Sequence, residues 1–207
     1  MNNKSGAILV VSGPSGAGKS TLINAMMKDL GDCYFSISTT TRPMREGEVD
    51  GVHYHFVTKE EFEKDIQEGH FLEYALVHSN YYGTSLKPVK KALQEKKLVI
   101  FDIDVQGNEA IKKQLGDITT SVFVTTPTLT ELENRLTTRS TDSAEVISKR
   151  IAMAKEEVKR VGEYEFLVVN DKLEEAVQTL TTIAKAARLK IEHKDVQEFI
   201  QKWVDKA

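Results

Sequence analysis

Four short runs of mostly apolar residues are spread along the chain and predict the strands of a buried sheet. They cover residues 7–11, 98–101, 121–125 and 166–169, and most are rich in β-branched side chains. Unbroken apolar runs of this length are typical of parallel strands that are covered on both faces. We therefore expect these four segments to form the centre of the fold.

Between these runs, apolar residues recur at helical spacing. Residues 20–30 carry one apolar face and are followed by Gly31, a common helix stop. Thr58 and Glu61 have the spacing of a capping box at the start of a short helix that Gly69 ends. The other predicted helices cover about 86–97, 128–136, 145–161, 173–189 and 195–204. Strands alternating with helices predict an α/β fold with a parallel sheet and right-handed crossovers.

The segment 34–57 has a different character, with short alternating pieces at 36–38 and 54–57 around a loop that carries Arg and Gly. Together with a strand at 71–77 it predicts a small β-rich insertion. We expect one domain over 1–207, with a core of about 1–34, 86–126 and 162–189, a β-rich lobe at 35–85 and a helical lid at 127–161. The tail 190–207 is expected to dock through Trp203.

Composition excludes several classes of protein. The 207 residues carry a net charge of −3, which gives no general attraction to nucleic acid or to an anionic membrane. A single cysteine, Cys33, cannot form an internal disulfide. The apolar run at 7–11 is too short for a signal-peptide core or a membrane span. These features favour a cytoplasmic protein.

Residues 13–20 match the phosphate-loop pattern G-x-x-x-x-G-K-[ST], between a predicted strand and a predicted helix. Such a loop curls its backbone amides around phosphate oxygens, and the helix that follows adds its unpaired amides and its dipole. A glycine-rich turn that only joins two elements is the alternative, but the full motif in this context argues against it. The predicted ATP-binding residues of this loop are Gly13, Pro14, Ser15, Gly16, Ala17, Gly18, Lys19, Ser20 and Thr21.

A carboxylate follows the second apolar strand, where a P-loop protein holds its metal. Lys19 is expected to reach the β- and γ-phosphates, and Ser20 and Asp102 to hold Mg²⁺. Asp102 and Asp104 are two residues apart on an extended segment and can therefore face the same cleft. Taken alone, an Asp at this position is usually a turn residue or a helix cap.

The acceptor site must lie elsewhere, and the loop around Arg42 and Arg45 is the candidate. Two arginine forks and the phenol of Tyr54 can clamp a second dianionic phosphate. For charged residues alone, an exposed polar loop would be the simpler interpretation.

Over nearly its whole length, up to about Leu189, the sequence resembles guanylate kinases. The matching blocks lie, in order, at 13–20, 38–54, 71–73, 80–84, 102–107, 135–150 and 169–171. An ordered set of blocks is far more specific than any single motif. The resemblance implies a P-loop NTPase-type parallel sheet flanked by helices, with a β-rich GMP-binding insertion and a helical lid.

The resemblance also implies roles for single residues. The GMP phosphate would be held by Arg42, Arg45, Tyr54 and Tyr82. Guanine would be read by Glu73, assisted by Ser38, Thr84 and Asp104. One carboxylate can accept both the N1–H and the 2-amino hydrogens of guanine, which adenine lacks. Sites of that kind reject the wrong base strongly, since it leaves a buried charge unpaired.

On the donor side, the resemblance assigns Arg135, Arg139 and Arg150 to the transferring phosphoryl group and Asn170 to the adenine side of ATP. Arginines on helices are more often surface ion-pair partners, and Asn170 can equally be a turn residue or a cap.

Two departures from the family pattern are visible. Pro43 directly follows Arg42, one place earlier than usual, and Ser140 stands where the lid commonly has glycine.

The sequence thus predicts an ATP:GMP phosphotransferase that acts on GMP or dGMP with Mg²⁺, as a monomer or homo-oligomer. Two alternatives stay open at this point. One is an inert guanylate-kinase-like module that binds phosphopeptides, and the other is a P-loop phosphotransferase with a different small acceptor. The five histidines are not spaced as a metal site, and we expect them to be structural or surface residues.

Overall fold

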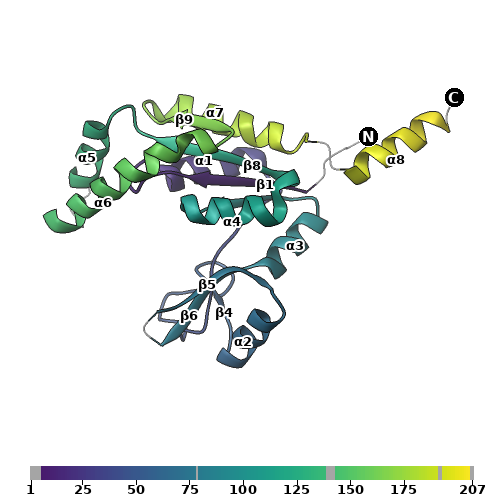
Figure 1. Ribbon diagram of the computed structural model, residues 1–207, viewed down its shortest axis with the longest axis horizontal. Coiled ribbons are helices and arrows are strands. Elements are labelled where there is room, and N and C mark those ends of the chain that lie inside the picture. The colour runs from purple at the N-terminus through teal and green to yellow at the C-terminus, as the bar shows by residue number, and fades with distance from the viewer. Residues whose placement is uncertain (1–5, 78, 139–142, 191–192, 206–207) are drawn as a thin grey trace.

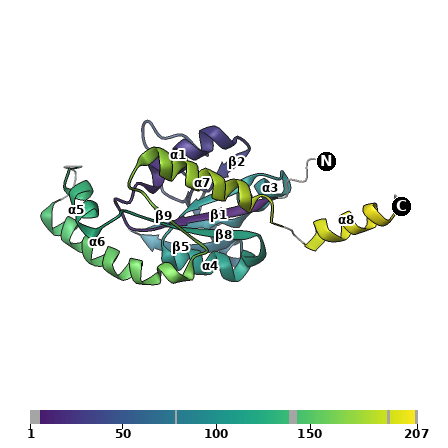
Figure 2. The ribbon, with the colours of Figure 1, turned by 90° about the horizontal axis from the view of Figure 1, so that it is seen from above.

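A twisted parallel sheet forms the centre of the molecule (Figures 1 and 2). The computed structural model describes residues 6–77, 79–138, 143–190 and 193–205. The sheet has five strands, all parallel to their neighbours. In spatial order they are β2 (Cys33–Phe35), β7 (Leu98–Asp102), β1 (Ala7–Ser12), β8 (Thr119–Thr125) and β9 (Phe166–Val169).

Two apolar layers cover the sheet, and strand alternation divides the residues of β1 between them. Leu9 and Val11 pack in a cluster that includes side chains of α1 (Lys19–Leu30) and α7 (Leu173–Ala187). Ile8 and Val10 pack on the opposite face, in a cluster that includes α3 (Leu86–Gln94) and α4 (Val105–Leu115). All six residues of β1 are buried, and each large aliphatic side chain contributes about 1.5–3 kcal/mol of transfer free energy. This double burial explains why the strand is apolar throughout.

A second, smaller sheet forms a lobe beside the core and, in Figure 1, hangs below it. Its strands run in the order β4 (His55–Phe56), β3 (Thr39–Thr40), β6 (Asn80–Ser85) and β5 (Phe71–Val77). Helix α2 (Lys59–Gln67) covers it through Phe62, which is fully buried and stacks on Phe71 and Tyr81 at centroid distances of 4.1 and 5.0 Å. This aromatic stack fixes α2 to the hairpin of β5 and β6.

Two helices, α5 (Leu129–Thr138) and α6 (Ala144–Glu157), project from the core beside the end of the sheet (Figure 2). They are held together by a small apolar cluster around Leu132, Leu136 and Ala154. The 3₁₀ turn η2 (Val158–Glu163) leads from α6 to β9, and η1 (Gly116–Ile118) leads from α4 to β8. This pair lies within the segment 127–161, and its role as a lid stays a prediction.

Much of the predicted secondary structure is confirmed. The strands at 71–77 and 166–169 have the predicted bounds, and Thr58 and Glu61 form both hydrogen bonds of the capping box. The α/β fold class is confirmed as well, since the central sheet is parallel and flanked by helices.

Several details were wrong. Residues 36–38 form no strand; the strand is Cys33–Phe35, which joins the core sheet because it pairs in parallel with β7. The predicted boundary between core and lobe at 34–35 therefore cuts β2. Helix α4 and strand β6 were not predicted. The first turn of α4 is mostly polar, and apolar and polar residues do not alternate clearly along β6. Helix α3 ends at Gln94, before Lys96 with its φ of +59°, and α6 ends at Glu157.

The helix in the tail, α8 (His193–Val204), forms as predicted. The prediction that Trp203 docks the tail was wrong. The Trp203 side chain is 70% exposed, and Figures 1 and 2 show α8 pointing away from the core. Across the described ranges, no helix combines the length and the apolar character that crossing a membrane requires.

Candidate active site

The phosphate loop joins β1 to α1 through residues 13–18, and its glycines take backbone conformations that favour glycine. Gly13, Gly16 and Gly18 have φ values of +138°, +93° and +90°. A Cβ atom on Gly13 would come within 1.9 Å of the Val124 carbonyl oxygen, and one on Gly18 within 2.4 Å of Asn170 Nδ2. The glycines therefore let the loop curl tightly against β8 and β9.

Helix α1 begins at Lys19 with Gly18 as its N-cap, a residue that has no side chain to occupy the first amides. No acidic residue lies in its first turn. The N-terminal amides and the positive end of the helix dipole are thus available to an anion.

Lysine, hydroxyl and carboxylate groups meet beside this helix start. Lys19 Nζ donates to the Gly13 carbonyl at 2.7 Å and lies 3.8 Å from Asp102 Oδ1. Ser20 Oγ donates to Asp102 Oδ2 at 3.3 Å. A hydroxyl and a carboxylate at this distance are hard oxygen ligands of the kind that Mg²⁺ takes, so the residues fit the ion.

Asp104 has another partner. Its Oδ1 accepts a hydrogen bond of 2.8 Å from the Gly107 amide and so caps α4. Of the two acidic residues at this strand end, Asp102 lies beside Lys19 and Ser20, whereas Asp104 begins a helix. Asp104 is therefore a helix cap, as an Asp after a strand often is. Its contact with GMP stays a prediction.

A pocket of about 470 Å³ lies beside the phosphate loop. Its lining includes Thr21, Arg135 and Asn170. Asn170 Nδ2 donates to the Ala17 carbonyl at 2.8 Å, and Arg135 Nη2 donates to the Asn170 carbonyl at 3.0 Å. Asn170 thus braces the loop from the end of β9, and the pocket is large enough to take part of a nucleotide.

The predicted lid arginines differ in their surroundings. Arg135 on α5 forms an ion pair with Glu131 at 2.7 Å and lines the pocket. Arg150 on α6 donates to Ser15 Oγ at 2.7 Å and so links the lid to the phosphate loop. Arg139 and Ser140 lie outside the described residues.

In the lobe, Arg42 is enclosed by aromatic rings. Its guanidinium carbon lies 5.6 Å from the Tyr54 ring centroid, and the rings of Tyr54 and Tyr82 are 6.0 Å apart. Arg42 Nη2 donates to Glu48 Oε1 at 2.6 Å, and the Arg45 amide donates to Glu48 Oε2 at 2.7 Å. The predicted clamp residues Arg42, Tyr54 and Tyr82 are therefore neighbours, whereas Arg45 is connected to them through Glu48.

Glu48 was not assigned a role from the sequence, although it lies inside one of the matching blocks. Its hydrogen bond raises the pKa of Arg42, and the hydrogen bond from Arg42 lowers the pKa of Glu48. Glu48 thus orients the Arg42 guanidinium, which is charged with or without it. The signal that could have revealed it is the spacing of Glu48 six residues after Arg42 across a turn.

The residues expected to read guanine lie on the facing strands of the lobe hairpin. Glu73 on β5 is opposite Thr84 on β6, and Thr84 Oγ1 donates to Glu73 Oε1 at 3.3 Å. Thr84 is buried and Glu73 is exposed, so the carboxylate is oriented by the threonine but open to a ligand. The carbonyl of Ser38 accepts a hydrogen bond of 2.9 Å from the His55 amide, which ties the segment before β3 to β4.

Glu157, the last residue of α6, was also not assigned a role from the sequence. Burial raises the pKa of Glu157, while Lys19 opposes that rise and Asp104 adds to it. Its Oε2 is buried and has no hydrogen-bond partner among the residues that the structure describes. The sequence offered no signal, because a Glu at the end of an exposed helix is ordinarily solvated.

Comparison with known proteins agrees with this geometry. The family model for guanylate kinase matches residues 5–187. The chain is 66% identical over 205 residues to a guanylate kinase of Sulfurimonas denitrificans, covering 99% of this chain and 100% of the relative. It is 50% identical over 206 residues to a guanylate kinase of Wolinella succinogenes, covering 100% and 96%.

Among solved structures, the chain is similar to a guanylate kinase from Anaplasma phagocytophilum, with a TM-score of 0.66 and 29% identity. The match covers 90% of this chain and 88% of the other. With a phosphate loop, a second cluster of arginine and tyrosine in a β-rich lobe, and relatives matched end to end, the chain belongs to the guanylate kinase family.

Proposed function

We propose that the protein transfers the γ-phosphoryl group of ATP to GMP or dGMP, giving ADP and GDP or dGDP. The observation that carries this function is the Glu73–Thr84 pair in the same lobe as the Arg42, Tyr54 and Tyr82 cluster, with Thr84 and Tyr82 both on β6. Such a lobe offers one group for a guanine edge and another for a phosphate. The family membership of the chain supports the same acceptor.

On the donor side, the phosphate loop would hold the ATP phosphates with its amides and with Lys19. Ser20 and Asp102 would hold Mg²⁺, which neutralises charge on the β- and γ-phosphate oxygens when it is bound. The pocket beside Arg135 and Asn170 would take the adenosine. Lys19 must then exchange its hydrogen bond to the Gly13 carbonyl for a phosphate oxygen.

On the acceptor side, Glu73 would accept the N1–H and 2-amino hydrogens of guanine, and Ser38, Thr84 and Asp104 would complete the base site. Arg42, Arg45, Tyr54 and Tyr82 would hold the GMP phosphate. AMP has neither an N1–H nor a 2-amino group, so it would leave the carboxylate without these partners.

The reaction needs no basic side chain, because the acceptor phosphate oxygen is already ionised. Catalysis would come from positioning two anions in line and from offsetting their charge. Lys19, Arg42, Arg135, Arg139 and Arg150 would supply that charge. Arg150 is already tied to Ser15 of the phosphate loop, which favours an approach of the lid toward the donor site.

A coupled spectrophotometric assay with ATP and each of GMP, dGMP, AMP, UMP and dTMP tests this function. GMP and dGMP should be turned over with the highest kcat/KM. GMP binding without turnover would instead support an inert binding module, and a different preferred acceptor would support another phosphotransferase.

Lys19→Ala should largely abolish turnover, whereas Lys28→Ala at the far end of α1 should not. The cytoplasmic location and the oligomeric state stay predictions from the sequence.

A further inference from the structure

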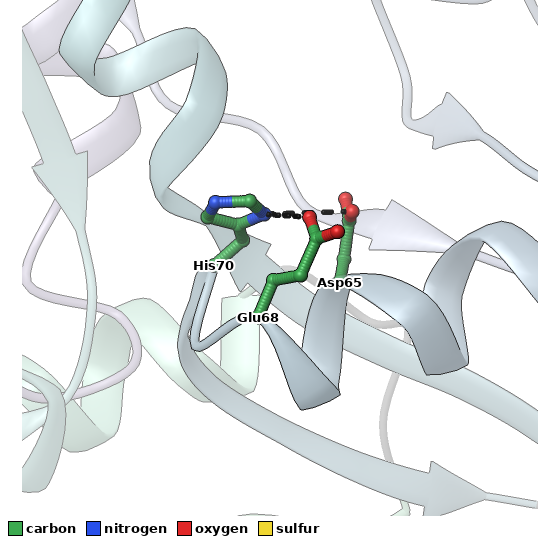
Figure 3. A group of neighbouring side chains, drawn as sticks. All are labelled: Asp65, Glu68 and His70. Atoms are coloured by element: carbon green, nitrogen blue, oxygen red, sulfur yellow. Dashed lines mark ion pairs between the residues drawn. The ribbon is translucent and has the colours of Figure 1, made fainter.

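A cluster of ligand-type side chains lies at the end of α2, on the outer part of the lobe. Asp65, Glu68 and His70 each offer one atom, and these atoms lie within 4.8 Å of one another (Figure 3). His70 Nδ1 lies 3.1 Å from Glu68 Oε2 and 3.6 Å from Asp65 Oδ1. Both carboxylates thus approach the same nitrogen.

The backbone fixes this arrangement. The Gly69 amide donates to the Ile66 carbonyl and the His70 amide to the Asp65 carbonyl, at 3.0 and 2.9 Å. These two bonds, with Gly69 at a φ of +67°, are those of a Schellman motif. In that motif the residues at the positions of Asp65 and His70 meet, usually as an apolar contact. Here a carboxylate meets an imidazole, so the ligands are held in place before any ion arrives.

The distances fit a small transition-metal ion. A tetrahedral ion with bonds of about 2.0–2.2 Å separates its ligand atoms by about 3.3–3.6 Å. The separation of 3.6 Å between His70 Nδ1 and Asp65 Oδ1 lies in that range, and the 3.1 Å between His70 Nδ1 and Glu68 Oε2 is slightly shorter. Moreover, the His70 Nδ1 atom is buried, and among the described residues it contacts the two carboxylates as the ion pairs drawn in Figure 3, without a well-aligned hydrogen bond.

We propose that Asp65, Glu68 and His70 form a binding site for a divalent transition-metal ion such as Zn²⁺, Co²⁺ or Ni²⁺. An imidazole with two carboxylates suits these ions, whereas Mg²⁺ prefers oxygen ligands alone. His70 and Glu68 are 28% and 42% exposed, so solvent can reach the ion and water can complete its coordination. Spacing among the histidines gave no hint, since two of the three ligands are acidic.

Lys87 competes for this site, because its ammonium donates to Asp65 Oδ1. An incoming ion would displace that ammonium, and the Lys87 side chain is half exposed and free to swing into solvent. The site also lies where the lobe meets α3, since the Leu86 amide donates to the His70 carbonyl at 2.7 Å. A bound ion would therefore tie the end of α2 to the residue that leads into β5.

The test is a titration of the full-length protein with Co²⁺ and Zn²⁺ in excess Mg²⁺, which occupies the oxygen site at Ser20 and Asp102. Visible absorption of Co²⁺ and calorimetry of Zn²⁺ should give one saturable site. His70→Ala and Asp65→Asn should each weaken binding at least about tenfold. Glu60→Gln, which removes an exposed carboxylate in the first turn of the same helix, should leave binding unchanged.

Two further measurements separate a metal site from an ordinary ion-pair cluster. Lys87→Met should tighten Zn²⁺ binding several-fold, because it removes the competing ammonium and keeps much of the apolar stem. Zn²⁺ should raise the melting temperature of the wild type but not of His70→Ala. Binding that is absent from the wild type, or unchanged in both His70→Ala and a folded His70→Gln variant, would overturn the proposal.

Discussion

At the scale of single residues, the hydroxyl of Thr84 orients the carboxylate of Glu73 through a hydrogen bond of 3.3 Å. Thr84 is buried and holds its position, whereas Glu73 is exposed and its carboxylate can bind a ligand. A carboxylate accepts two hydrogens, whereas an amide presents one acceptor and one donor group. The charge of Glu73 is therefore what the proposed guanine site depends on.

Replacing that charge gives the first prediction. Glu73→Gln should lower the ratio of kcat/KM for GMP to that for AMP by at least about tenfold, because a donor then faces the N1–H of guanine. Kinetics with both nucleotides measure the ratio, and Glu60→Gln on α2 is the control. An unchanged ratio would show that other residues read the base.

Glu165 provides a second prediction, in which pH is the variable. Its Oε2 accepts from the Ser121 amide at 2.7 Å, and its Oε1 pairs with Lys190 at 2.7 Å. Burial alone would raise the pKa of Glu165, but Lys190 and Ser121 outweigh it and lower the pKa from 4.5. The stabilising effect of the charge is therefore present above pH 4.5 and is lost as the pH falls through the lower pKa of the folded state.

Glu165→Gln should lower the free energy of unfolding at neutral pH by up to about 1 kcal/mol, since the pair is partly exposed and solvent screens it. Urea unfolding of both proteins over a pH series measures the difference. The gap should shrink as the medium becomes more acidic than pH 4.5. A gap that persists at the acidic end would mean that the substitution acts through packing instead.

At the scale of elements, the connection between β1 and α1 is limited by backbone contacts. Gly13 approaches the Val124 carbonyl so closely that a Cβ atom would lie 1.9 Å from its oxygen. Gly116, the first residue of η1, has a helical backbone and no atoms within 4 Å of the added Cβ. The two glycines therefore offer a matched comparison.

Gly13→Ala should destabilise the fold by about 2 kcal/mol or more, because the loop must move away from β8. Gly116→Ala should be neutral or stabilise by about 0.5 kcal/mol, since alanine restricts the unfolded chain. Urea unfolding measures both, and binding of ATP should be weakened in the first variant alone. Equal stabilities would contradict the close contact seen here.

At the scale of the whole molecule, three parts carry the residues of the candidate site. The core supplies the donor site, the lobe supplies the Arg42 cluster, and α6 reaches the loop through Arg150. The helix α8 stands apart from all three (Figure 1). Phe199, Ile200 and Trp203 on it are 58%, 47% and 70% exposed.

Removal of the tail is therefore expected to cost little. A chain that ends at Lys190 retains the pair with Glu165 and should keep its kcat/KM within about twofold and its melting temperature within about 2 °C. A coupled assay and a thermal melt check this. Size-exclusion chromatography of both chains is the control, because a smaller assembly after truncation would show that α8 forms an interface between copies.

The sequence by itself determined the elements whose signals are local. The apolar run of β1, the glycine pattern of the phosphate loop and the capping box at Thr58 each depend on residues close together in the chain, and each formed as predicted. The predicted role of Glu73 was accessible only through the family resemblance, because a single charged residue on a strand carries no local signal.

Only the tertiary structure decided which distant groups meet. The pairing of Cys33–Phe35 with β7 and the brace from Asn170 to Ala17 depend on contacts across the fold. By contrast, Asp65, Glu68 and His70 lie within six residues of one another, and their contact follows from the local Schellman turn at Gly69. Local sequence sets the conformation of a segment, but packing between segments sets which side chains become neighbours.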